Sequence, residues 1–123
     1  MLIPPGYTVL SRNLFNYPTE HLYIVISPVV KRKVLLVNIT SKKESSDLSC
    51  ILNKGDHEFI RHESVVNYAD ATDADIRKVL WAIACNLFKP QKPVSPDLLI
   101  EIQKGALISE AFKPKYLKYI TIK

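Results

Sequence analysis

The sequence predicts a mainly-β α+β fold, in which a small curled antiparallel sheet or barrel over about residues 7–68 is followed by two helices. Two observations favour this class. Several short runs rich in β-branched and aliphatic residues lie before Tyr68, and after it the apolar period changes from two toward 3.6. The chain has 123 residues, of which 47% are hydrophobic and 24% charged, as in ordinary globular proteins. We therefore expect a single domain over residues 1–123.

The strongest predicted element is an antiparallel hairpin, with strands over residues 21–27 and 34–40. The two runs match in length and are almost continuously aliphatic, which is typical of central strands covered on both faces. A turn centred between Val30 and Lys31 places His21 opposite Thr40, with their Cβ atoms about 4.5–5.5 Å apart. The hairpin therefore brings an imidazole and a hydroxyl to one edge of the sheet.

Shorter runs complete the predicted sheet, with strands over residues 7–10, 48–52, 58–61 and 64–68. The first follows Pro4-Pro5-Gly6, which disfavours a helix. The polar run over residues 41–47 is predicted as a mobile loop, because it is rich in serine and charge and has no apolar period. Short strands in this number indicate a sheet that curls.

Two amphipathic helices are predicted after the sheet. The first covers residues 72–89, with Thr72 as its N-cap, and its apolar face is wide enough to pack against a second helix or another subunit. The second covers residues 96–105 and starts at Ser95-Pro96-Asp97, a capping serine followed by a proline at the first helical position. The tail over residues 111–123 alternates lysines with apolar and aromatic residues. It fits a last strand with a lysine-guarded edge, or a basic-aromatic segment that faces RNA.

The charge and the cysteines of the chain indicate its partners and its cellular compartment. The formal net charge of +5 favours anionic partners, nucleic acid above all, although a charged surface that only keeps the protein soluble is the alternative. Cys50 and Cys85 lie in apolar runs without a CxxC motif, which predicts buried thiols in a reducing compartment. The first residues lack the features of a signal peptide, and no apolar run is long enough to span a membrane. We expect a cytoplasmic protein that does not enter membranes.

A resemblance to the MazF/PemK family of bacterial toxins rests on three segments in order: residues 21–28 (HLYIVISP), 34–41 (VLLVNITS) and 49–52 (SCIL). Residues 94–103 (VSPDLLIEIQ) also resemble the C-terminal helix of these toxins. The resemblance covers about residues 6–108, with gaps. It implies an SH3-like barrel with appended helices, a homodimer, sequence-selective cleavage of single-stranded RNA, and neutralisation by an antitoxin protein.

The chain departs from the family pattern at one functional position. Where the family has an arginine and then a proline after the histidine, this chain has Leu22 and Tyr23. The family's arginine holds the scissile phosphate, and Leu22 cannot do so. Thr40 and Ser41 match the family's hydroxyl positions.

Residues outside the family pattern offer a replacement. RNA cleavage without a metal ion needs a general base for the ribose 2′-OH, an acid for the departing 5′-oxygen, and a cation or donor for the phosphate oxygens. The predicted catalytic residues are His57 and Asp56 on an exposed turn after Gly55, together with His21, Thr40 and Ser41. The predicted RNA-binding residues are Lys31, Arg32, Lys33, Lys42, Lys43, Arg61 and His62.

These residues also have ordinary structural interpretations. A histidine at a turn is often only part of the surface, and His62 points away from His57 if both lie on one regular strand. A metal site of Asp56, His57 and His62 matches no ligand signature, so we expect neither a metal nor another cofactor.

Two functions of different class follow from the sequence. The first is a toxin-like, metal-independent endoribonuclease that cleaves single-stranded RNA by 2′-OH attack. The second is a non-catalytic SH3-like barrel that binds RNA or a protein partner with the same basic edge.

Overall fold

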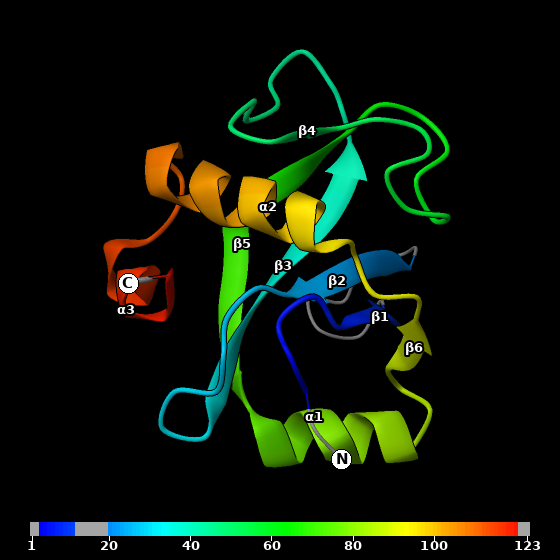
Figure 1. Ribbon diagram of the computed structural model, residues 1–123, viewed down its shortest axis with the longest axis vertical. Helices are drawn as coiled ribbons and strands as arrows, with labels where there is room; N and C mark the ends of the chain where they lie inside the picture. Colours follow the sequence, from blue (N-terminus) through cyan, green and yellow to red (C-terminus); the bar gives the residue numbers. More distant parts are fainter. Residues whose placement is uncertain (1–2, 12–19, 121–123) are drawn as a thin grey trace.

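The fold is a six-stranded antiparallel sheet that curls into a half-barrel and carries three α-helices (Figure 1). The computed structural model describes residues 3–11 and 20–120. The strands, in the spatial order β4-β5-β3-β2-β1-β6, are β1 (Thr8–Ser11), β2 (His21–Val25), β3 (Lys33–Ser41), β4 (Ile51–Leu52), β5 (Ser64–Asp75) and β6 (Lys89–Gln91). The helices are α1 (Ile76–Ala84), α2 (Pro96–Ile108), a 3-10 turn (Pro114–Tyr116) and α3 (Leu117–Ile120). The predicted mainly-β α+β class, with C-terminal helices packed on a curled antiparallel sheet, is confirmed.

Different helices cover the two faces of the sheet. On one face, Leu22 and Ile24 of β2 share a core with Ile102 of α2 and Tyr119 of α3. On the other face, β2 and β3 pack with Val79 of α1 in a second core. Figure 1 shows α2 crossing the sheet and α1 at the end opposite β4. The prediction that the two central strands are covered on both faces is confirmed, and this explains why they carry almost no polar residues.

The central hairpin has the predicted register. Tyr23 pairs with Asn38 and Val25 with Leu36, and continuing this register places His21 opposite Thr40. The turn differs from the prediction: Lys31 and Arg32 form its two central residues, one position later than expected. Both have the positive φ that hairpin turns of this length require, 49° and 67°. The predicted register holds as far as Ile26 and is shifted at Val30, which pairs with Lys33. Pro28 lies between them and has no N–H to donate to the neighbouring strand.

One predicted strand and the bounds of the first predicted helix are wrong. Residues 58–61 form a turn rather than a strand, because the backbone N–H of Ile60 bonds back to the carbonyl of His57, 2.9 Å. Thr72 does not cap a helix: it pairs with Leu36, so β5 continues to Asp75, which is the N-cap of α1. The helix therefore begins at Ile76 and ends at Ala84 instead of covering residues 72–89.

The tail is not a strand either. Pro114 begins a 3-10 turn that continues into α3, and together they bury Tyr116, Tyr119 and Ile120. The last residues of the predicted tail, 121–123, lie outside the described residues. The predicted strand over residues 48–52 shortens to Ile51–Leu52.

The second helix follows its sequence signals. Ser95 caps α2, and its Oγ accepts a hydrogen bond from the backbone N–H of Leu98 at 3.1 Å. The helix then runs three residues further than predicted, to Ile108. No helix in the described ranges is both long and apolar enough to cross a membrane. Cys50 and Cys85 are free cysteines; Cys50 is buried as predicted, whereas Cys85 is exposed, because it follows the last turn of α1 on the solvent side.

Candidate functional site

A hollow of about 630 Å³ lies where β2 and β3 meet the turn over residues 58–62. Five of the residues that the sequence analysis singled out line it: His21, Thr40, Ser41, Arg61 and His62. We call this hollow the histidine pocket. Its other lining residues are Glu20, Ile39, Glu58, Phe59, Ile60, Ser64 and Gln91.

A short polar contact in the histidine pocket joins two exposed side chains, with Ser41 Oγ 2.7 Å from His62 Nε2. Ser41 is the last residue of β3 and pairs with Ser64, the first residue of β5. The Ser64 hydroxyl donates a hydrogen bond to the carbonyl oxygen of His62 at 3.0 Å, which fixes the bend before the strand. The imidazole of His62 therefore lies against Ser41 at the end of β3.

His21 enters the same pocket from the first residue of β2. Its Nδ1 lies 3.2 Å from the carbonyl oxygen of Ile39. A carbonyl only accepts hydrogen bonds, so this contact assigns the proton to Nδ1, and Nε2 carries the lone pair of the neutral ring. Thr40, half-buried, follows Ile39 in β3. The pocket thus holds two imidazoles and, with Ser64, three hydroxyls.

Charges of both signs surround these groups. Arg61 is exposed at the pocket, and Glu20 and Glu58 line it as well. Glu20 forms an ion pair with Lys89, 3.0 Å, at the rim. The pocket is therefore close to balanced in charge rather than strongly positive.

Lys42 and Lys43 lie beside the histidine pocket rather than in it. They line a neighbouring hollow of about 490 Å³ together with His62, Glu44 and Glu63. Lys42 is paired with Glu63 at 3.1 Å, so its charge is partly offset.

His57 lies away from the pocket, and the expectation that its turn exposes the imidazole is wrong. Its side chain is 5% exposed, with Nε2 bonded to the carbonyl oxygen of Lys92 and Nδ1 accepting from the backbone N–H of Phe59 at 3.0 Å. Nδ1 thus holds the turn itself, and Nε2 ties the turn to the chain after β6. Asp56 does not orient this ring. Its carboxylate accepts from the backbone N–H of Asn53, 2.7 Å, and lines a different hollow beside α2.

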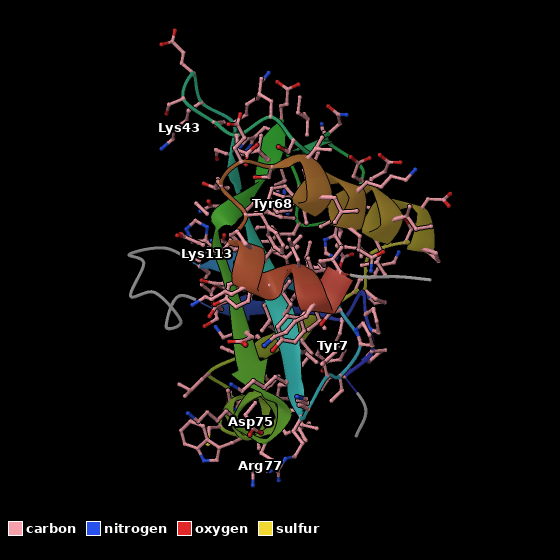
Figure 2. All side chains as sticks on the ribbon, turned by 90° about the vertical axis from the view of Figure 1, so that its left-hand side faces the viewer. Tyr7, Lys43, Tyr68, Asp75, Arg77 and Lys113 are labelled. Carbon is pink, nitrogen blue, oxygen red and sulfur yellow. The ribbon has the colours of Figure 1, made fainter. Side chains whose placement is uncertain are left out.

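Lys31, Arg32 and Lys33 also lie away from the pocket, at the opposite end of β3. The strand has nine residues, and at about 3.3 Å per residue it separates the two ends by roughly 26 Å. Figure 2 shows the same separation, with Lys43 near one pole of the molecule and Asp75 and Arg77 at the other. The predicted RNA-binding residues thus divide into two groups.

The sequence analysis missed Phe59, which lines the pocket and is 37% exposed. An exposed aromatic ring next to an arginine is a signal for base stacking, but the predicted strand over residues 58–61 concealed it. It also missed Gln91, because β6 has no strand-like composition. The Ser41–His62 contact depends on the bend before β5, which no local pattern indicates.

The loop beside the pocket is held by a carboxylate. Asp47 accepts hydrogen bonds from Ser49 Oγ and Ser109 Oγ, each 2.5 Å, and so ties the loop after β3 to the end of α2. Burial raises the pKa of the Asp47 carboxyl, but these hydrogen bonds outweigh it and hold the pKa below its usual range.

No set of three or more His, Cys, Asp or Glu side chains in the described part of the chain is arranged to hold a metal ion. Leu22 is fully buried in the core and does not line the pocket. Comparisons of the chain with protein-family models, with curated proteins and with solved structures found no match.

Proposed function

We propose that the protein is an endoribonuclease that cleaves single-stranded RNA without a metal ion, by attack of a ribose 2′-OH in the histidine pocket. The observation that carries the proposal is the 2.7 Å contact between Ser41 and His62, in a hollow that also holds His21. Two imidazoles beside one hollow are what a reaction with one proton acceptor and one proton donor needs. This assignment moves the second histidine from the predicted His57 to His62.

The reaction divides between the two rings. Neutral His21 takes the proton of the 2′-OH at Nε2, and the 2′-oxygen attacks the phosphorus atom. Protonated His62 gives its Nε2 proton to the 5′-oxygen as the bond from phosphorus to that oxygen breaks. The products are a 2′,3′-cyclic phosphate and a 5′-hydroxyl, and exchange of protons with water restores both rings.

The other residues of the pocket stabilise and position the substrate. Arg61 supplies the positive charge for the phosphorane oxygens, and the Thr40 hydroxyl adds a hydrogen bond to them. Phe59 presents a ring on which a base stacks. Ser41 holds the imidazole of His62 in place before the RNA enters.

The proposal includes the biological setting that the resemblance to MazF/PemK toxins implies. The protein acts as the toxin of a toxin–antitoxin system, is neutralised by an antitoxin protein that covers the histidine pocket, and works as a homodimer. It acts in the cytoplasm, where its RNA substrate is located. The free thiols of Cys50 and Cys85 are consistent with that reducing compartment.

A non-catalytic module that binds RNA or a protein partner is the second candidate. The carboxylates of Glu20 and Glu58 in the same hollow favour it, because they weaken the stabilisation of a developing anion.

Incubation of the protein with end-labelled single-stranded RNA of random sequence, in the presence of a chelator, separates the two candidates. The proposal predicts a small set of cleavage positions whose products carry 2′,3′-cyclic phosphates, and loss of these products in His62→Gln and His21→Gln. Lys104→Gln, an exposed substitution on α2, is the matched control and should cleave normally. RNA that is retarded in a gel but stays intact would overturn the nuclease proposal in favour of the module.

A further inference from the structure

A second surface of the molecule combines cations with an exposed aromatic ring. It lies at the hairpin turn between β2 and β3 and on the adjoining face of α1, and it consists of Lys31, Arg32, Lys33, Arg77, Lys78 and Trp81. We call it the basic pole. All six of these side chains are exposed.

The two parts of the basic pole are joined by backbone contacts. The carbonyl oxygen of Arg32 accepts a hydrogen bond from the backbone N–H of Ile76 at 2.9 Å, so the turn is fixed to the first residue of α1. Lys33 also pairs with Asp75, the N-cap of α1. The turn and the start of α1 are therefore joined, and their cations lie at the same end of the molecule, where Figure 2 labels Asp75 and Arg77.

Charge is concentrated at this surface. Residues 31–33 and 75–78 contain five cations and one carboxylate, a local charge of +4 in a chain whose net charge is +5. Asp75 is the carboxylate, and it is occupied by Arg77: the guanidinium contacts it at 3.0 Å. Hydrogen bonds from the Arg77 side chain and backbone lower the pKa of Asp75 to about 2, so the pair stays charged at all ordinary pH values. The other four cations form no ion pair with a described residue.

Trp81 gives the basic pole a flat apolar face. Val79 and Ala82 on the buried side of α1 pack into the core, whereas Trp81 is 60% exposed and lines a shallow hollow of about 330 Å³ with Asp75, Arg77 and Lys78. An exposed ring beside a group of cations matches a base next to its backbone phosphates.

We propose that the basic pole is a second binding site for single-stranded nucleic acid, in which one base stacks on Trp81 and neighbouring phosphates contact Lys31, Arg32, Lys33 and Lys78. The site stands apart from the histidine pocket by roughly the length of β3, and its binding does not depend on cleavage. A single strand fits better than a duplex, whose bases are stacked on one another and cannot reach the indole. A membrane fits less well, because of the six residues that make up the basic pole Trp81 alone is large and apolar, and stable docking takes a wider apolar face.

The protein carries a built-in probe of this site, because Trp81 is its single tryptophan. Titration with an oligouridylate and an oligothymidylate of about twelve nucleotides, a length that spans several phosphates, should quench the tryptophan fluorescence. Quenching by both oligomers supports a site that reads the phosphate and base; quenching by RNA alone supports one that also reads the 2′-OH. His62→Gln should quench like the unchanged protein, so that a failure of the nuclease proposal leaves this test intact.

Substitutions then measure each part of the basic pole. Replacing Lys31 and Lys33 together by glutamine should lower the affinity about tenfold at ~0.1 M salt and reduce the slope of log affinity against log salt by about 1.4. Trp81→Ala, followed by the anisotropy of a labelled oligomer, should weaken binding by roughly 5- to 100-fold. Lys104→Gln on α2 is the matched control. It removes one positive charge far from the basic pole and should leave the affinity and the salt dependence nearly unchanged. Because all these side chains are exposed, circular dichroism should be the same for every variant.

Two results would overturn the inference. One is tryptophan fluorescence that stays unchanged up to the highest concentration of either oligomer. The other is quenching and a blue shift with vesicles of mixed phosphatidylserine and phosphatidylcholine but not with either oligomer, which would assign the surface to anionic membranes instead.

Discussion

The two ends of β3 differ in the chemistry of the side chains around them. At the end that holds Thr40 and Ser41, two histidines and three hydroxyls share a hollow with charges of both signs. At the other end, which begins with Lys33, cations dominate and no imidazole is present among the residues of the basic pole. The strand keeps the two groups roughly 26 Å apart.

Because of this difference, the proposed proton transfer and attraction of a polyanion take place on separate surfaces, and a single surface is poorly suited to both. Proton transfer needs groups that change charge during the reaction, and a strongly positive neighbourhood would disfavour the protonated imidazole. Attraction of a polyanion needs a fixed positive charge, which acts over about 8–10 Å at physiological salt. We infer that the hairpin turn attracts the nucleic acid while the other end of the same strand reacts with it.

The largest expected effect comes from His62. His62→Gln removes the proton donor but keeps a side chain that reaches Ser41, so the cleavage rate should fall by roughly 10²- to 10⁴-fold. Binding at the basic pole should not change. Rates measured under single-turnover conditions, with binding measured separately by tryptophan quenching, check both statements. A cleavage rate within about twofold of the unchanged protein would remove His62 from the mechanism.

His57 should behave in the opposite way. His57→Ala leaves the N–H of Phe59 and the carbonyl of Lys92 without their partner, which should reduce the free energy of unfolding by about 2 kcal/mol. Cleavage by the folded fraction should persist, since the ring does not line the pocket. Urea unfolding and a cleavage assay at low temperature test the two parts. Lost cleavage at unchanged stability would return His57 to the catalytic role that the sequence predicted.

These two histidines show what the sequence could and could not predict. The hairpin and its register followed from two aliphatic runs of matched length, and the start of α2 followed from Ser95-Pro96-Asp97, because both signals are local. The position of His57 depends on Lys92, a residue 35 positions later, and the position of His62 depends on the pairing of Ser41 with Ser64. Only the assembled fold fixes such distant partners.

β5 and β6 make the same point about secondary structure. Asp73 and Asp75 are typical of the first turn of a helix, yet pairing with β3 keeps both of them in strand β5. β6 contains a proline and a lysine and is held by pairing with β1 at the edge of the sheet. In both cases tertiary pairing overrides local preference.

Charge removal at the basic pole should affect binding more than chemistry. With Lys31 and Lys33 both replaced by glutamine, KM for a long single-stranded RNA should rise about tenfold while kcat stays the same, because the lost contacts are equal in the ground state and the transition state. A matched comparison with a short RNA that cannot span both ends should show little change. A fall in kcat with KM unchanged would contradict the separation of tasks.

The smallest effect concerns the loop beside the histidine pocket. Since the pKa of Asp47 is lowered in the folded protein, its carboxylate stabilises the fold above the unfolded-state pKa, and this contribution is lost as the pH falls through the lower folded value. Asp47→Asn should therefore cost about 1 kcal/mol at neutral pH and flatten the acid dependence below about pH 4. Urea midpoints at pH 7 and pH 3 measure this. An equal loss at both values would mean that the carboxylate charge is not what holds the loop.

The most direct test of the account uses one RNA with a single altered sugar. Once a cleavage position is mapped in a chelator, the same RNA is made with a 2′-deoxyribose at the nucleotide that precedes the cut. We expect a 2′,3′-cyclic phosphate from the unmodified RNA and an intact strand at that position from the modified one, because the modified RNA lacks the nucleophile. Cleavage of the modified strand at the same bond, or cleavage of neither RNA, would contradict the assignment of the histidine pocket as a ribonuclease site.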